Sequence, residues 1–209
     1  LVHDISSSAD ERIIRDVYEQ MGIRKEDLLA VVSSPPCETF SHADASNTRP
    51  FPNDNYYRNH EHEDKPPRSW ASCKDQSALD KRRKAIQHDQ MVRNMVRSHA
   101  KDMKQGWTYD MVIENPQGSL RQRPYMRGEE FERTFNRTTM DYCSYGKPYR
   151  KTTDLWSTFE FNARGLTGNG KCNNGRCKQG KFSEKGRFRH TVVIAGGNER
   201  NLKGPGVKQ

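Results

Sequence analysis

The strongest constraint on the fold is a pair of short apolar runs separated by a long helical pattern. Leu28–Val32 and Tyr109–Glu114 have the composition of strands, and Gln76–Lys104 has apolar residues at helical spacing. A continuous apolar run such as Leu28–Val32 is typical of a strand buried on both faces of a parallel sheet. Strand, helix and strand in this order form a βαβ unit, which predicts that the two strands are parallel neighbours.

Other elements extend this α/β pattern toward both ends of the chain. Leu1–Ile5 is a short apolar segment, and a capping box begins a helix over Ser8–Gly22. Two further strands are predicted at Met140–Tyr145 and Thr153–Phe161. The predicted fold class is therefore α/β, with an open sheet of the Rossmann-like kind.

Two segments of unusual composition suggest how the chain is divided. Residues 42–75 are rich in Pro and His and nearly free of aliphatic residues, so we interpret them as a long polar loop. After residue 160 the sequence is rich in Gly, Asn, Lys and Arg. We predict a main domain over residues 1–160 and a small basic, Cys- and Gly-rich appendage over residues 161–209.

Charge is distributed unevenly along the chain. The 36 Lys and Arg against 27 Asp and Glu give a net charge of +9. Residues 1–75 hold 9 basic and 14 acidic residues, and residues 76–209 hold 27 and 13, so the two parts carry −5 and +14. A surface that basic attracts polyanions, because phosphate contacts release counterions. A solvated basic tail explains the same counts equally well.

Several classes of protein are excluded by the sequence. No apolar run approaches the roughly 18 residues that a membrane-spanning helix needs. The chain does not begin with a charged and then apolar leader of the secretory kind. Five cysteines at wide spacings argue against a disulfide framework. We therefore expect an intracellular protein that is neither secreted nor embedded in a membrane.

Two predicted strands end in reactive side chains. Leu28–Val32 leads into Pro36-Cys37, and the second strand ends at Glu114. Ligands of doubly wound sheets bind at the carboxyl ends of the strands, so this thiol and this carboxylate are expected to share a cleft. A thiolate adds to an electron-poor ring while an acid group holds the ring nitrogen. The alternatives are a small buried Cys37 and a Glu114 that only caps a helix or pairs with a basic residue.

These residues resemble a known family. Pro36-Cys37-Glu38-Thr39-Phe40-Ser41 is similar to the nucleophile loop of DNA (cytosine-5) methyltransferases, and Ile113-Glu114-Asn115 is similar to their Glu-Asn signature. Leu1–Ile5 resembles the strand whose Asp contacts the adenine of S-adenosylmethionine. Tyr145-Gly146-Lys147-Pro148 resembles the start of a later strand of the family. The four elements occur in the family's order over residues 1–153.

The resemblance implies a role for each matching residue. Cys37 would add to C6 of a cytosine that is flipped out of DNA, and Glu114 would hold the ring at N3. C5 would then take the methyl group of S-adenosylmethionine. Asp4, Ile5 and Pro35 would bind the cofactor. Ser41, Arg150 and Lys151 would contact the backbone of the target nucleotide.

The sequence departs from the family pattern at several positions. Tyr149 stands where Gln is usual, and Lys151 and Thr153 stand where Arg is usual. The chain begins after the glycine-rich cofactor loop of the family, so we expect the methyltransferase sheet to be incomplete at its amino end. Binding of S-adenosylmethionine would then need an upstream segment or a second chain. The alternative function is an inactive, methyltransferase-like subunit that binds nucleic acid, RNA as readily as DNA, in a larger complex.

A second candidate site lies in the appendage. Cys172 and Cys177 form a Cys-x4-Cys pair, and His190 follows. Thiolate and imidazole ligands in a segment that is poor in apolar residues predict a structural zinc ion, with Cys143 as the expected fourth ligand. The alternative is a pair of reduced thiols on a basic surface loop.

Overall fold

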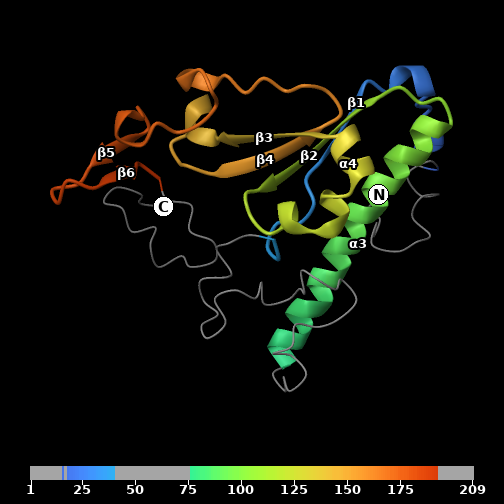
Figure 1. The fold of residues 1–209 in the computed structure, drawn as a ribbon, viewed down its shortest axis with the longest axis horizontal. Helices are drawn as coiled ribbons and strands as arrows, with labels where there is room; N and C mark the ends of the chain where they lie inside the picture. Colours follow the sequence, from blue (N-terminus) through green and yellow to red (C-terminus); the bar gives the residue numbers. More distant parts are fainter. Residues whose placement is uncertain (1–15, 17, 41–75, 193–209) are drawn as a thin grey trace.

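The structure is a computed structural model that describes residues 16, 18–40 and 76–192 of the chain. It contains a four-stranded sheet with the strand order β1-β2-β4-β3 and a separate two-stranded sheet, β5-β6 (Figure 1). The strands are β1 (Ala30–Ser33), β2 (Asp110–Pro116), β3 (Asn136–Asp141), β4 (Thr152–Ser157), β5 (Gly180–Phe182) and β6 (Phe188–His190), and the helices are α3 (Gln76–Lys104) and α4 (Glu129–Thr134).

The predicted βαβ unit is present. Strands β1 and β2 are parallel neighbours, with Ala30 opposite Asp110 and Ser33 opposite Ile113. Strand β4 runs antiparallel to both β2 and β3. Three strands therefore share one direction, and the sheet is mixed. The α/β class is confirmed at this level.

Helix α3 has the bounds that its apolar spacing predicts. Its buried positions recur every three or four residues along one face, and Val92 and Met95 on that face join Met111, Ile113 and Trp156 in the hydrophobic core. In Figure 1, α3 lies at one end of the four-stranded sheet, and β5 and β6 lie at the other end. In the described part of the chain no helix combines the length and apolar character needed to cross a membrane.

The prediction that the first strand is buried on both faces is wrong. Strand β1 has β2 on one side and no described strand on the other, so it is an edge strand among the described residues. Val32 is 71% exposed, and Leu29, just before the strand, is 81% exposed. A continuous apolar run therefore does not by itself mean burial on two faces.

The two later strands are displaced from their predicted bounds. Strand β3 begins at Asn136 and ends at Asp141, because Tyr142–Tyr145 forms a 3-10 turn that closes at Gly146 with a φ of +86°. The start of β3 was missed because Asn136 and Arg137 are polar. Strand β4 ends at Ser157 rather than Phe161.

Candidate functional site

The loop after β1 is anchored to the strand beside it. Asn115 of β2 is fully buried, and its Nδ2 donates a hydrogen bond to the carbonyl oxygen of Pro35 at 3.1 Å. At the other end of the loop, the backbone N–H of Ser119 donates to the carbonyl oxygen of Phe40 at 2.8 Å, and the Phe40 ring is buried. Cys37 lies between these anchors with an exposed side chain. The thiol is therefore presented to solvent at the carboxyl ends of two parallel strands.

Glu114 is held by two donors at the same edge of the sheet. Its Oε1 accepts hydrogen bonds from Lys151 Nζ at 3.0 Å and from the Tyr142 hydroxyl at 3.1 Å. The Glu114 side chain is 17% exposed and that of Lys151 is 31% exposed. The carboxylate therefore already has partners when no ligand is bound.

The electrostatics of Lys151 connect this pair with the thiol. Burial opposes the charge of the ammonium group, but the hydrogen bond and the charge of Glu114 outweigh it, so the pKa of Lys151 is raised. The negative charge of an ionised Cys37 acts in the same direction.

The structure brings some of the predicted residues together and separates others. Cys37, Glu114 and Lys151 lie at one edge of the sheet, and the buried Pro35 supports the loop that carries Cys37. Arg150 instead binds Asp141 through its Nε. The predicted residues Asp4, Ile5 and Ser41 lie outside the described residues.

The second candidate site is a cluster of three thiols and one imidazole. The ligand atoms of Cys143, Cys172, Cys177 and His190 all lie within 4.8 Å of one another. Zinc with Zn–S bonds of about 2.3 Å holds tetrahedral sulfur ligands about 3.8 Å apart. These four residues, hereafter the Cys3His cluster, are the four that the sequence predicts, and their donor set fits zinc.

Each ligand of the Cys3His cluster comes from a different local structure. Cys143 lies in the 3-10 turn that follows β3, and His190 is the last residue of β6. Cys172 and Cys177 flank another 3-10 turn, Asn174–Arg176. The cluster therefore joins the four-stranded sheet to the β5-β6 sheet, and its ligands come from both sides of residue 160.

The surroundings of the Cys3His cluster shift the pKa values of two of its ligands. Burial raises the pKa of Cys143 to about 12, and the neighbouring Cys172 and Cys177 act in the same direction. Burial and the charge of Arg150 lower the pKa of His190, which favours the neutral imidazole that binds metals. A bound zinc ion compensates clustered thiolates with positive charge, so the protonated cluster would release protons when it takes up metal. Four protein ligands close the coordination sphere, as in structural sites.

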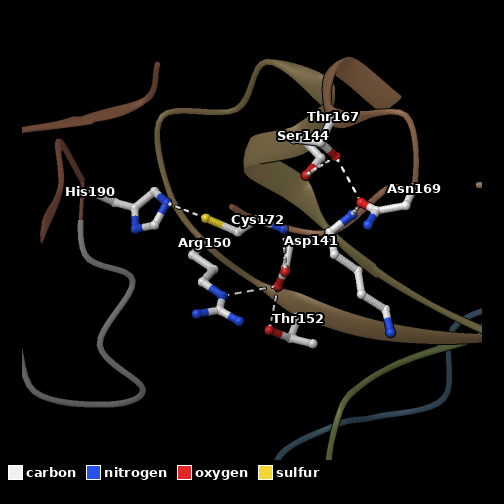
Figure 2. A network of polar contacts seen from close by, with 9 residues as sticks. Asp141, Ser144, Arg150, Thr152, Thr167, Asn169, Cys172 and His190 are labelled. Carbon is white, nitrogen blue, oxygen red and sulfur yellow. Dashed lines mark hydrogen bonds and ion pairs between the residues drawn. The ribbon is translucent and has the colours of Figure 1, made fainter. Parts of the chain in front are cut away.

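Asp141 holds the cluster and the neighbouring strand together. Its Oδ2 accepts a hydrogen bond from the backbone N–H of Cys172 at 2.7 Å, and its Oδ1 accepts from Arg150 Nε at 3.1 Å and from the Thr152 hydroxyl (Figure 2). Burial favours a protonated Asp141, but these donors prevail and the pKa of Asp141 is lowered. Figure 2 also shows His190 directed at Cys172, with 3.4 Å between Nε2 and Sγ.

The two candidate sites share two short stretches of backbone. The first stretch is Asp141-Tyr142-Cys143. Asp141 contacts Arg150, Tyr142 contacts Glu114, and Cys143 belongs to the Cys3His cluster. Lys151 lies between Arg150 and Thr152, and its carbonyl oxygen accepts a hydrogen bond from the Tyr142 backbone N–H at 3.1 Å. Sequence reasoning missed Asp141 and Tyr142. Neither residue belongs to a motif, and the one signal in the sequence was their position just before the predicted ligand Cys143.

Comparison with known proteins identifies no family for this chain. No protein-family model matches the chain, and neither the curated proteins nor the solved structures contain a significant match.

Proposed function

We propose that this chain is a DNA cytosine-5 methyltransferase-like protein in which Cys37 and Glu114 receive a flipped cytosine. The observation that carries the proposal is the anchored loop. The Asn115–Pro35 hydrogen bond ties the segment that presents Cys37 to the strand that carries Glu114. Thiol and carboxylate are thus presented at the strand ends where ligands of α/β sheets bind.

The Glu114–Lys151 pair suits the polar edge of cytosine. A carboxylate accepts hydrogen bonds and an ammonium group donates them. The amino group of cytosine is a donor, whereas its N3 and O2 are acceptors, so the pair offers both kinds of partner. Cys37 is the nucleophile: its thiolate adds to C6, which makes C5 electron-rich. C5 would then take a methyl group, and loss of the C5 proton with departure of the thiolate restores the aromatic ring.

S-adenosylmethionine would supply the methyl group. Of the residues that the resemblance assigns to this cofactor, only Pro35 lies among the described residues, and its carbonyl oxygen is already bound by Asn115. Pro35 therefore supports the loop that carries Cys37. The Cys3His cluster has a structural role in this proposal, because it fastens the segments that carry Tyr142 and Lys151.

A covalent trap tests the proposal. Duplex DNA with 5-fluorocytosine and S-adenosylmethionine would leave a stable protein–DNA adduct, because fluorine at C5 blocks the elimination that frees the thiol. With protein that includes any residues its gene encodes ahead of Leu1, we expect an adduct on Cys37, none with Cys37→Ala, and an unchanged adduct with the control Cys73→Ala. An adduct that survives Cys37→Ala would overturn the assignment of the nucleophile.

A second function is favoured by one observation. Glu114 already accepts hydrogen bonds from Lys151 and Tyr142, so a base must compete with internal donors. A chain that binds DNA or RNA without rearranging this carboxylate would be an inactive, nucleic-acid-binding relative of the methyltransferases. In the trap experiment this function predicts binding of both the fluorinated and the ordinary duplex, with no adduct on any cysteine.

A further inference from the structure

A cavity of about 690 Å³ opens on the part of the molecule that follows β2. Three arginines line it: Arg121 and Arg127 come from the segment between β2 and α4, and Arg137 comes from β3. The other lining side chains are mainly polar or aromatic, and they include Phe131, Phe135 and Trp156. We call this the arginine cavity. A volume of this size is typical of ligand pockets.

The arginine cavity is separate from the Cys37–Glu114 site. Trp156 lies opposite Ile113 across the β2–β4 ladder, and Glu114 is the next residue along β2. Successive side chains of a strand point to opposite faces of the sheet. Trp156 and Glu114 are therefore on different faces, and a ligand in the arginine cavity does not meet the carboxylate of the candidate site.

The three arginines carry charge that the described residues do not neutralise. No carboxylate in the described part of the chain lies within ion-pair distance of Arg121, Arg127 or Arg137, and Glu132 is the one acidic residue that lines the cavity. Other arginines nearby are paired: Arg123 with Asp89 at 3.2 Å, and Arg133 with Glu129 at 3.8 Å. Like charges that converge on one cavity repel each other unless an anion lies between them.

The burial of the aromatic side chains that line the cavity indicates which part of a ligand is recognised. Phe131, Phe135 and Trp156 are only 5%, 5% and 3% exposed, so their ring faces are covered and offer little area for stacking on a base. Arginine guanidinium groups bind phosphate oxygens in pairs, through two parallel hydrogen bonds. The chemistry of the cavity therefore fits phosphate groups better than aromatic rings.

We propose that the arginine cavity binds phosphate groups. Two sources fit this chemistry, the backbone of a nucleic-acid strand and the phosphates of a free polyphosphate. The proposal does not depend on methyl transfer, because it uses none of the residues of the Cys37–Glu114 site. With a nucleic-acid strand as the source, the cavity would be an additional contact that grips the backbone without reading the sequence.

The test compares two ligands with two charge-matched variants. The first variant changes all three cavity arginines, R121Q/R127Q/R137Q. The control, R83Q/K104Q/R133Q, removes the same charge at three exposed positions that do not line the cavity. The ligands are a fluorescent oligo-dT strand, which contains no cytosine, and inorganic triphosphate. Affinities are measured by anisotropy and calorimetry in a range of salt concentrations.

We expect the cavity variant to lose at least about tenfold in affinity for one of the ligands relative to the control, and the ligand with the larger loss identifies the source. If the strand is the source, the slope of log K against log salt falls by about 2, because three phosphate contacts contribute about 0.7 each for single strands. The single variants Arg121→Gln, Arg127→Gln and Arg137→Gln keep the test valid if the triple variant does not fold. Equal affinities of the cavity variants and the control for both ligands would overturn the proposal.

Discussion

Lys151 has a different role in the structure from the one that its sequence position suggests. From the sequence it stood where the family has an arginine, and it was expected to contact the backbone of a nucleotide. In the structure its ammonium group lies 3.0 Å from Glu114. Lys151, which stands where the methyltransferases that the sequence resembles have Arg, therefore forms an ion pair with Glu114, the residue that resembles the Glu of their Glu-Asn signature. A compact ammonium group on a flexible stem suits this role, since it acts as a point charge and does not need the paired geometry of a guanidinium group.

The strength of this pair is measurable. In a double-mutant cycle with Lys151→Met and Glu114→Gln, we expect a coupling free energy of about 1 kcal/mol from chemical denaturation, because both groups are partly shielded from water. The folded pKa of Lys151 is raised, so the coupling is fully present below the ordinary lysine pKa of about 10.4 and is lost as the pH rises through the folded value. Measurements therefore belong at neutral pH.

The control cycle uses the exposed pair of Arg133 and Glu129, whose side chains are 73% and 85% exposed. There we expect a coupling below about 0.5 kcal/mol. Equal coupling free energies for the two pairs would show that the partial burial of Glu114 does not strengthen its ion pair with Lys151.

Among the elements, the turn after β3 contributes to both candidate sites. Cys143 in this turn belongs to the Cys3His cluster, and Tyr142 beside it reaches Glu114. The segment from Arg150 to Thr152 runs alongside and is fixed by Asp141. Movement of the turn would therefore disturb the metal ligands and the carboxylate together.

The stoichiometry of zinc tests the cluster directly. We expect one zinc ion per chain in metal analysis of freshly purified protein, and less than one with Cys172→Ser, because three ligands bind zinc more weakly than four. Cys37→Ser, which changes an exposed cysteine outside the cluster, should keep the full amount. Removal of zinc by a chelator should lower the Tm by several degrees, since structural zinc contributes to folding. Protein that is fully folded and free of metal would end this assignment.

Asp141 allows a finer test of the same elements. Asp141→Asn keeps the four ligands but weakens the hydrogen bonds to Cys172 and Arg150, so zinc affinity should fall about 10- to 100-fold, as for other residues that orient metal ligands. Competition with a zinc-binding dye gives the affinity. Asp110→Asn, at an exposed position on β2, is the control that should leave it unchanged.

Elements that depend on a local pattern were predicted correctly from the sequence, and features that depend on distant neighbours were not. Helix α3 was predicted with its full length, because its apolar spacing is regular over many turns. The ligand set of the Cys3His cluster was also predicted, because few residue types bind zinc and the chain has few cysteines. The exposure of β1 was not predictable, since burial depends on what lies beside a strand. Tyr142 was missed for a similar reason: its contact with Glu114 comes from the pairing of strands, which no local pattern records.

At the scale of the whole molecule, one end of the described structure carries a group of exposed basic residues. The basic residues of the β5-β6 region are exposed, among them Lys181, Arg187 and Arg189. This region lies at the end of the four-stranded sheet opposite to α3 (Figure 1). Exposed positive charge at one end of the molecule would orient a polyanion during its approach.

Salt dependence tests this feature. We expect the affinity for duplex DNA to fall steeply with salt, and K181Q/R187Q/R189Q to lower the slope of log K against log salt by up to about 3, because each lost phosphate contact removes about 0.9. Filter binding at several salt concentrations provides the slopes. If the wild-type slope is flat, phosphate contacts do not drive the binding.

The distribution of cysteines has a practical consequence. Cys143, Cys172 and Cys177 belong to the Cys3His cluster, whereas the sulfur of Cys37 is exposed between two anchor points of its loop. In a Cys73→Ala background, a thiol-reactive fluorophore would attach at Cys37 while bound zinc protects the clustered sulfurs. The loop after β1 thus provides its own labelling position, and the emission of the dye would report when another molecule enters the edge of the sheet where Glu114 and Lys151 meet.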